Sequence, residues 1–146
     1  MTLTGTCRCA AITYSLSSDA PIAVYACHCT NCQTWSGSSF ALHSLLPEGA
    51  LTPSGPLTEY AYEENGQHAR HYLCGTCHTR IYNTTSAAPG LWVLRAATLD
   101  NSPQLTPMAH IWTRHKQAWL DLPQDIPSWP QSPTPQAFMQ ALAAIC

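Results

Sequence analysis

Cysteine spacing constrains the fold of this 146-residue chain more than any other feature. Seven of the eight cysteines form three short clusters, Cys7-x-Cys9, Cys27-x-Cys29-x-x-Cys32 and Cys74-x-x-Cys77, and Cys146 stands alone. In a reducing compartment, cysteines this close in sequence are more often metal ligands than disulfide partners. Disulfides are the alternative for an exported protein, although neighbours in Cys-x-Cys make strained bridges. The clusters therefore predict metal sites.

Composition limits the classes of function. The formal net charge is −2, and the six Lys and Arg residues form no basic cluster, so we expect no nucleic-acid partner. No apolar run approaches the roughly 18 residues of a membrane span, and the first residues, MTLTGTC, lack the apolar stretch of a signal peptide. We expect one domain over residues 1–146, in the cytoplasm and not in a membrane.

The hydrophobic pattern predicts a mainly β fold. Short alternating or β-branched segments are separated by Gly, Pro, Asn and Ser turn signals, which is typical of all-β folds. The expected strands are 11–16, 22–27, 38–46, 57–62, 69–73, 91–99 and 108–113. Residues 30–37 lack this alternation and end in Gly37, so we expect one or two helical turns there.

The last third of the chain has a different character. Seven of the twelve prolines fall at about 103–135, which predicts an irregular arm on the surface. An amphipathic helix follows at about 135–145, with Thr134 as its N-cap and Pro135 as its first residue.

The first and third clusters predict one closed metal site. Zinc in a tetrahedron of thiolates, with Zn–S near 2.3 Å, needs sulfur atoms about 3.8 Å apart, a spacing that short cysteine pairs can supply. Cys7, Cys9, Cys74 and Cys77 would saturate one ion, which makes this site structural. Either pair could instead join residues 27–32.

The middle cluster predicts a second, different site. In an extended segment, alternate residues share a face, so Cys27 and Cys29 can bind one ion while His28 points elsewhere. Cys32 follows one turn later and can reach the same ion. Three ligands and one open position are the catalytic arrangement of zinc, whereas a fourth ligand from His43, His110 or Cys146 would close the site. A redox pair of Cys29 and Cys32 is a third possibility.

Four segments together resemble the glutathione-dependent formaldehyde-activating enzyme family, whose domain is shared with centromere protein V. They are GTCRCAAITY, CHCTNCQTWSGSSF, CGTCHTRIY and HIWT. The resemblance implies a β-tent of small antiparallel sheets around a structural zinc, and two Zn²⁺ ions per chain. It implies that Cys7, Cys9, Cys74 and Cys77 bind the structural zinc, and that Cys27, Cys29 and Cys32 bind a second, catalytic zinc.

The family reaction joins glutathione and formaldehyde into S-hydroxymethylglutathione, and it is classed as a carbon–sulfur lyase. The expected partners are therefore a small-molecule thiol such as glutathione and a small aldehyde. The sequence departs from the family pattern at Ala10 and His78, where glycine is usual, and at Gln33 and Thr34, where basic residues are common.

Two further roles complete the hypothesis. His28 and His110 are the candidates for proton transfer, because one adjoins a predicted ligand and the other lies in the HIW motif. Glutathione carries two carboxylates, so a basic clamp is expected from among Arg70, Arg80, Arg95, Arg114 and Lys116. The alternatives are a zinc-stabilised module that binds proteins without catalysis, and a different thiol or aldehyde reaction at the same site.

Overall fold

The fold of residues 2–17 and 22–143 is described by a computed structural model. The chain divides into two compact units, which we describe separately. The first unit comprises residues 1–20 and 44–104, and the second comprises residues 21–43 and 105–146. Strand β4 (Ala41–Pro47) runs from the second unit into the first.

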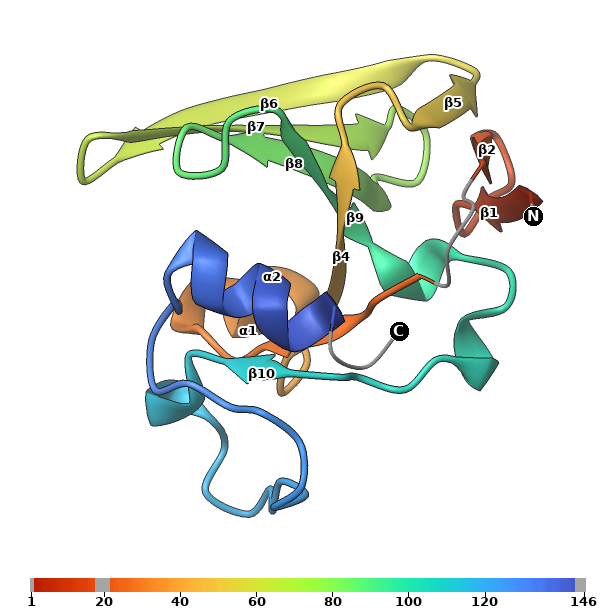
Figure 1. The fold of residues 1–146 in the computed structure, drawn as a ribbon. Helices are drawn as coiled ribbons and strands as arrows, with labels where there is room; N and C mark the ends of the chain where they lie inside the picture. The colour runs from red at the N-terminus through yellow and green to blue at the C-terminus, as the bar shows by residue number, and fades with distance from the viewer. Residues whose placement is uncertain (1, 18–21, 144–146) are drawn as a thin grey trace. The chain divides into compact units, whose positions relative to one another are not determined.

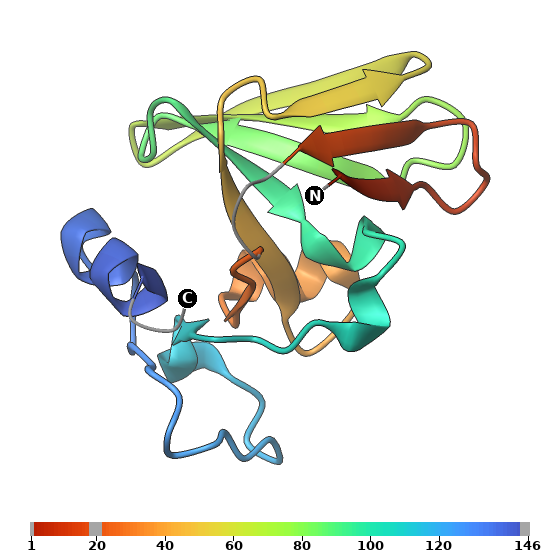
Figure 2. The same cartoon turned by 45° about the vertical axis from the view of Figure 1, so that its right-hand side comes forward.

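A three-stranded antiparallel sheet opens the first unit. Its order is β1 (Thr2–Thr6), β2 (Thr13–Ser17) and β5 (Leu51–Ser54), and Figure 2 shows β1 and β2 as the red pair of arrows. Tyr14 and Leu16 alternate with more exposed residues along β2 and are buried, as expected for a strand with one covered face.

Four further antiparallel strands belong to the first unit. They are β6 (Leu57–Glu64), β7 (Gln67–Cys74), β8 (Arg80–Thr85) and β9 (Leu91–Arg95), and β6, β7 and β8 lie side by side in Figure 1. Asn65 and Gly66 join β6 to β7 with positive φ angles of 52° and 78°, as a two-residue hairpin turn requires. The 3₁₀ helices η1 (Ala96–Thr98) and η2 (Ser102–Gln104) follow β9.

The second unit is built around a short central strand, β3 (Tyr25–Cys27). This strand pairs antiparallel with the first residues of β4 and parallel with β10 (His110–Ile111). The other elements are α1 (Thr30–Ser36), η3 (Thr113–His115) and α2 (Pro135–Ala143). Thr134 caps α2, since its hydroxyl accepts the Ala137 N–H, and the buried Phe138 packs edge-on against Tyr25.

The structure confirms the mainly β class, the short helix after Cys29 and the terminal helix. Three strands were not predicted: β1 has little apolar content, β5 contains Pro53, and β8 mixes polar with apolar residues. The expected strands at 91–99 and 108–113 are shorter, as β9 and β10. The single-domain assignment stays a prediction. Among the described residues, no helix is long and apolar enough to cross a membrane.

Gly5 makes the packing of β1 against Tyr14 possible. The two residues face each other across the strands, and a Cβ on Gly5 would lie 2.0 Å from Tyr14 Cζ. We expect Gly5→Ala to displace the ring, break the 2.7 Å bond between Tyr14 Oη and Thr98 Oγ1, and cost about 1–3 kcal/mol in urea unfolding. The control is Gly66→Asn, in open space where Asn tolerates the turn. Equal losses in both variants would contradict this account.

His71 makes the first unit sensitive to acid. It is buried, it stacks on Tyr62, and Arg80 Nη1 donates to its Nδ1 at 3.3 Å. Burial, followed by the charges of Arg95 and Arg80, lowers the pKa of His71 from 6.5 to about 3. The unfolded chain therefore binds the proton first, and the stabilisation present above pH 6.5 is lost as the pH falls toward 3.

Replacement of His71 should remove this part of the pH dependence. We expect the free energy of unfolding of His71→Gln to fall less steeply between pH 6 and pH 4 than that of the wild type, by up to about 1.4 kcal/mol per pH unit. His68→Gln, at an exposed position of the same strand, is the matched control for the loss of a histidine side chain. Parallel profiles for His71→Gln and the wild type would show that His71 is not responsible.

Candidate metal centres

The first cysteine cluster lies in the first unit. Cys7 and Cys9 lie in the turn between β1 and β2, Cys74 ends β7, and Cys77 lies in the turn before β8. All four sulfur atoms lie within 4.8 Å of one another. The Cys7–Cys9 and Cys9–Cys74 sulfur separations are 3.7 and 3.8 Å, which match the edge of a zinc–thiolate tetrahedron of about 3.8 Å.

The surroundings favour the thiolate form at Cys7 and Cys77, whose pKa values are lowered. At Cys9 the Ala11 backbone lowers the pKa, but burial and the other three thiols outweigh it and raise the pKa to about 11. The Ile12 N–H donates to Cys7 Sγ at 3.3 Å, and the N–H groups of Thr76 and Cys77 donate to Cys74 Sγ at 3.4 Å. The Thr79 hydroxyl lies 3.1 Å from Cys77 Sγ and is the main reason that the pKa of Cys77 falls to about 5. Metal ligation needs thiolates, so these turns fit a metal ion.

Each of the two turns holds a non-glycine residue in the left-handed conformation. Ala10, directly after Cys9, has φ 68°, and His78, directly after Cys77, has φ 63°. Glycine adopts this left-handed conformation without a steric penalty, whereas other residues pay about 1–2 kcal/mol. The turns thus keep the geometry that glycine favours, although neither residue is glycine.

The second cluster lies in the second unit, where strand β3 passes into helix α1. Cys27 ends β3, Cys29 is the N-cap of α1, and Cys32 lies in its first turn. Their sulfur atoms lie within 4.8 Å of one another. The Cys32 N–H donates to Cys29 Sγ at 3.3 Å, and hydrogen bonds from the Cys27 and Cys32 thiols lower the pKa of Cys29 to about 2. This cluster therefore already favours a thiolate at Cys29.

His28 lies outside this sulfur cluster, as the alternation along an extended segment predicts. Its side chain is fully buried, its ring lies 5.2 Å from that of Phe40, and its Nε2 is 3.0 Å from His110 Nδ1. Burial, then His110 and Lys116, lower the pKa of His28 to about 4, and burial also lowers the pKa of His110. Both rings are therefore neutral near pH 7.

A fourth ligand for the second cluster was predicted to come from His43, His110 or Cys146, if the site is closed. Within residues 2–17 and 22–143, no Cys, His, Asp or Glu joins Cys27, Cys29 and Cys32 in the ligand group. His43 packs against the Tyr25 ring, and His110 contacts His28. Cys146 lies outside the described residues.

The seven described cysteines are free thiols in two groups, one of four and one of three. Both groups fit a metal ion, because their sulfurs converge within ligand distance and accept backbone N–H donors. The difference in the number of thiols is the main chemical difference between the two clusters.

The five candidate cations lie in different surroundings. In the first unit, Arg70 is exposed and its Nη1 is 2.5 Å from Glu59 Oε1, whereas Arg80 and Arg95 flank the buried His71. In the second unit, Lys116 Nζ donates to the Leu120 carbonyl at 2.9 Å, and Arg114 lines a cavity. These last two residues belong to the same unit as the second cluster.

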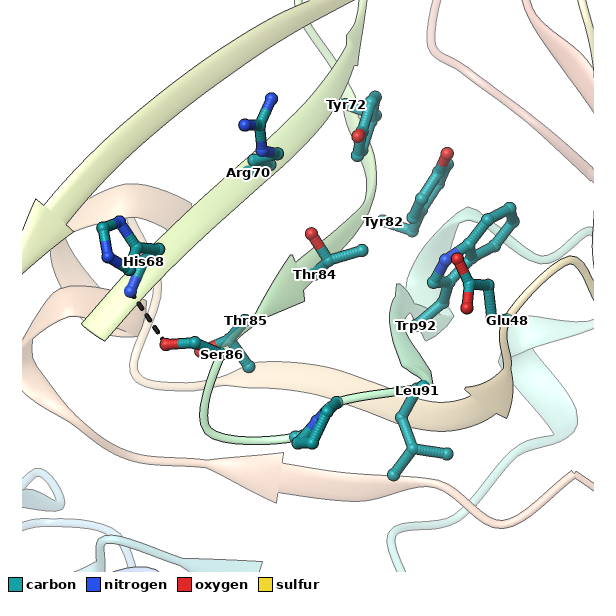
Figure 3. A pocket seen from close by; sticks show the side chains of 13 residues that line it. Glu48, His68, Arg70, Tyr72, Tyr82, Thr84, Thr85, Ser86, Leu91 and Trp92 are labelled. Carbon is teal, nitrogen blue, oxygen red and sulfur yellow. Dashed lines mark hydrogen bonds between the residues drawn. The ribbon is translucent and has the colours of Figure 1, made fainter.

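Sequence reasoning missed a cavity of about 380 Å³ in the first unit, shown in Figure 3. Tyr72, Tyr82 and Trp92 form a row along one side, with ring centroids 4.6 and 4.4 Å apart, and Arg70 lies beside Tyr72. The three rings come from adjacent strands, so their proximity depends on the strand register. None of the clustered cysteines lines this cavity.

Sequence reasoning also missed the role of Gln33. Its Nε2 donates to the carbonyls of His28 and His115, each at 2.7 Å, and its Oε1 accepts from Gln117 Nε2 at 2.7 Å. One side chain thus ties the segment between Cys27 and Cys29 to the arm at residues 115–117. A glutamine has donors and an acceptor that can serve all three bonds, but its partners are distant in sequence, so no local pattern identifies them.

Comparison with known proteins identifies a family whose model covers both cysteine clusters. The sequence matches the model of the family described as "Glutathione-dependent formaldehyde-activating enzyme" over residues 2–115, and no curated protein matches. A crystal structure of a Rhodobacter sphaeroides protein is similar, with a TM-score of 0.55 and 20% identity, over 71% of this chain and 91% of that one. That likeness concerns the fold. The family match, which spans both cysteine clusters, shows that this chain belongs to the glutathione-dependent formaldehyde-activating enzyme family.

Proposed function

We propose that this protein is a zinc-dependent carbon–sulfur lyase that adds a thiol, glutathione in the simplest case, to a small aldehyde. Cys7, Cys9, Cys74 and Cys77 would hold a structural zinc, and Cys27, Cys29 and Cys32 would hold a second, catalytic zinc. The observation that carries the proposal is the three-thiol group, which leaves one ligand position without a described side chain.

The reaction needs a nucleophilic sulfur. A zinc ion held by Cys27, Cys29 and Cys32 would bind an incoming thiol as its thiolate, which is the reactive form at neutral pH. In the addition, a carbon–sulfur bond forms, the carbonyl π bond breaks, and the oxygen takes a proton. The thiol supplies that proton, so the reaction needs no oxidant or reductant.

The chain supplies the charge balance and a path for the proton. Three cysteine thiolates around a dication carry one net negative charge, and a fourth thiolate makes two. Lys116 lies close enough to contribute, after burial and His110, to the lowered pKa of His28. We assign proton transfer to His28 and His110, whose Nε2 and Nδ1 atoms lie 3.0 Å apart.

The cytoplasmic location belongs to the same proposal. It is supported by the seven described cysteines, all of which are free thiols although their sulfur atoms approach one another closely. A reducing compartment keeps such thiols available for metal ions.

A matched pair of variants tests the proposal. Zinc content, urea unfolding and glutathione titration should be measured for the wild type, Cys32→Ser and Cys74→Ser. We expect two zinc ions in the wild type, and loss of one ion and of glutathione binding in Cys32→Ser, which stays folded. Cys74→Ser should lose the structural ion and most of its stability, because structural zinc binding supplies folding free energy.

The alternatives give different results. A non-catalytic module with two closed sites would bind zinc but not glutathione, and Cys32→Ser would destabilise it as much as Cys74→Ser. A different thiol or aldehyde reaction would show thiol binding at the second ion with no product from glutathione and formaldehyde. Either outcome overturns the proposed activity.

A further inference from the structure

The second unit contains a cavity of about 540 Å³ lined by Arg114, Trp129, Pro130, Gln131 and Ser132. The lining joins one cation to two apolar side chains and two polar ones. Arginine offers a planar pair of N–H donors that matches a carboxylate, whereas Trp and Pro suit the aliphatic part of a ligand. The cavity therefore has the chemistry to bind a carboxylate on a short apolar arm.

Hydrogen bonds hold the walls of this cavity in place. The N–H groups of Thr113 and Arg114 donate to the carbonyls of Trp129 and Pro130 at 3.1 and 3.3 Å. Trp112 Nε1 donates to Ser132 Oγ at 2.9 Å. Because Ser132 accepts that bond with a lone pair, its O–H remains able to donate to a bound carboxylate.

The charge on Arg114 is not neutralised by the described part of the chain. Its side chain is exposed, and no Asp or Glu among residues 2–17 and 22–143 forms an ion pair with it. Arg70 is the contrasting case, since Glu59 already occupies its guanidinium. Of these two arginines, Arg114 is the one able to recruit an external anion.

The Gln33 hydrogen bonds connect this cavity to the second cysteine cluster. Gln33 directly follows Cys32, and it donates at 2.7 Å to the carbonyl of His115, the residue after Arg114. One glutamine side chain therefore links the helix that carries Cys32 to the segment that carries Arg114. The ends of an extended tripeptide lie about 10 Å apart, so the carboxylates of a peptide thiol reach several ångströms beyond its sulfur atom.

We propose that Arg114, with Ser132, binds a carboxylate of the peptide thiol substrate, and that Trp129 and Pro130 contact the aliphatic part beside it. This inference rests on the proposed function, since it assigns the recognition of the same thiol. The cation would then come from the arm, since helix α1 contains no Lys or Arg. Gln33 is then a positioning residue, because it acts through the arm.

Two thiol ligands, one with free carboxylates and one without, test whether Arg114 binds a carboxylate. The second site is loaded with cobalt, whose absorption reports thiol binding, and titrated with glutathione and with glutathione diethyl ester, which keeps the thiol but has no free carboxylate. We expect Arg114→Gln to weaken glutathione binding about 10- to 100-fold and to leave binding of the ester unchanged. Arg114→Lys should recover part of the loss. The control is Arg70→Gln, which should bind both ligands like the wild type.

The possible outcomes distinguish failure of the carboxylate assignment from failure of the proposed function. If both thiols bind the wild type and Arg114→Gln binds glutathione equally well, the carboxylate assignment is wrong and the proposed function stands. If Arg114→Gln weakens both ligands equally, the assignment is also wrong, because the effect is then structural. If neither thiol changes the cobalt absorption of the wild type, both the assignment and the proposed function fail.

Discussion

The convergence of thiols from distant parts of the chain is the constraint on which the rest of the structure depends. In the first unit, the turn after β1 and the turn after β7 bring four sulfur atoms within 4.8 Å of one another. Their residues, 7 and 77, are separated by most of that unit's sequence. Closing so long a loop costs conformational entropy, and four thiolates around one ion can offset that cost. Two of the four described non-glycine residues with positive φ, Ala10 and His78, are found at these same turns.

The second cluster differs from the first in how its cysteines are placed along the chain. Its three sulfurs come from one continuous segment, so it closes no long loop. Its surroundings are instead built from side chains that fix positions: His28 against His110, and Gln33 between His28, His115 and Gln117. These hydrogen bonds fix the orientation of the groups beside the three cysteines.

The sequence predicted the features that depend on local spacing. The clusters, the exclusion of His28 from the sulfur group, the helix after Cys29 and the Thr134 cap all follow from rules that span a few residues. Strands β1, β5 and β8 could not be predicted in this way. Their sequences are rich in polar residues or include a proline, and they form strands only because they pair with neighbouring strands. The Gln33 bonds and both cavities join residues that are distant in sequence, so spacing rules could not reveal them.

Cadmium NMR measures the central claim most directly, because each bound cadmium ion gives a resonance whose position reports how many sulfur atoms surround it. We expect two resonances. One lies in the four-sulfur range and does not shift when glutathione is added, and the other lies in the three-sulfur range and shifts toward the four-sulfur range when glutathione is added. Two resonances in the four-sulfur range before any thiol is added, neither of them moved by glutathione, would contradict this expectation.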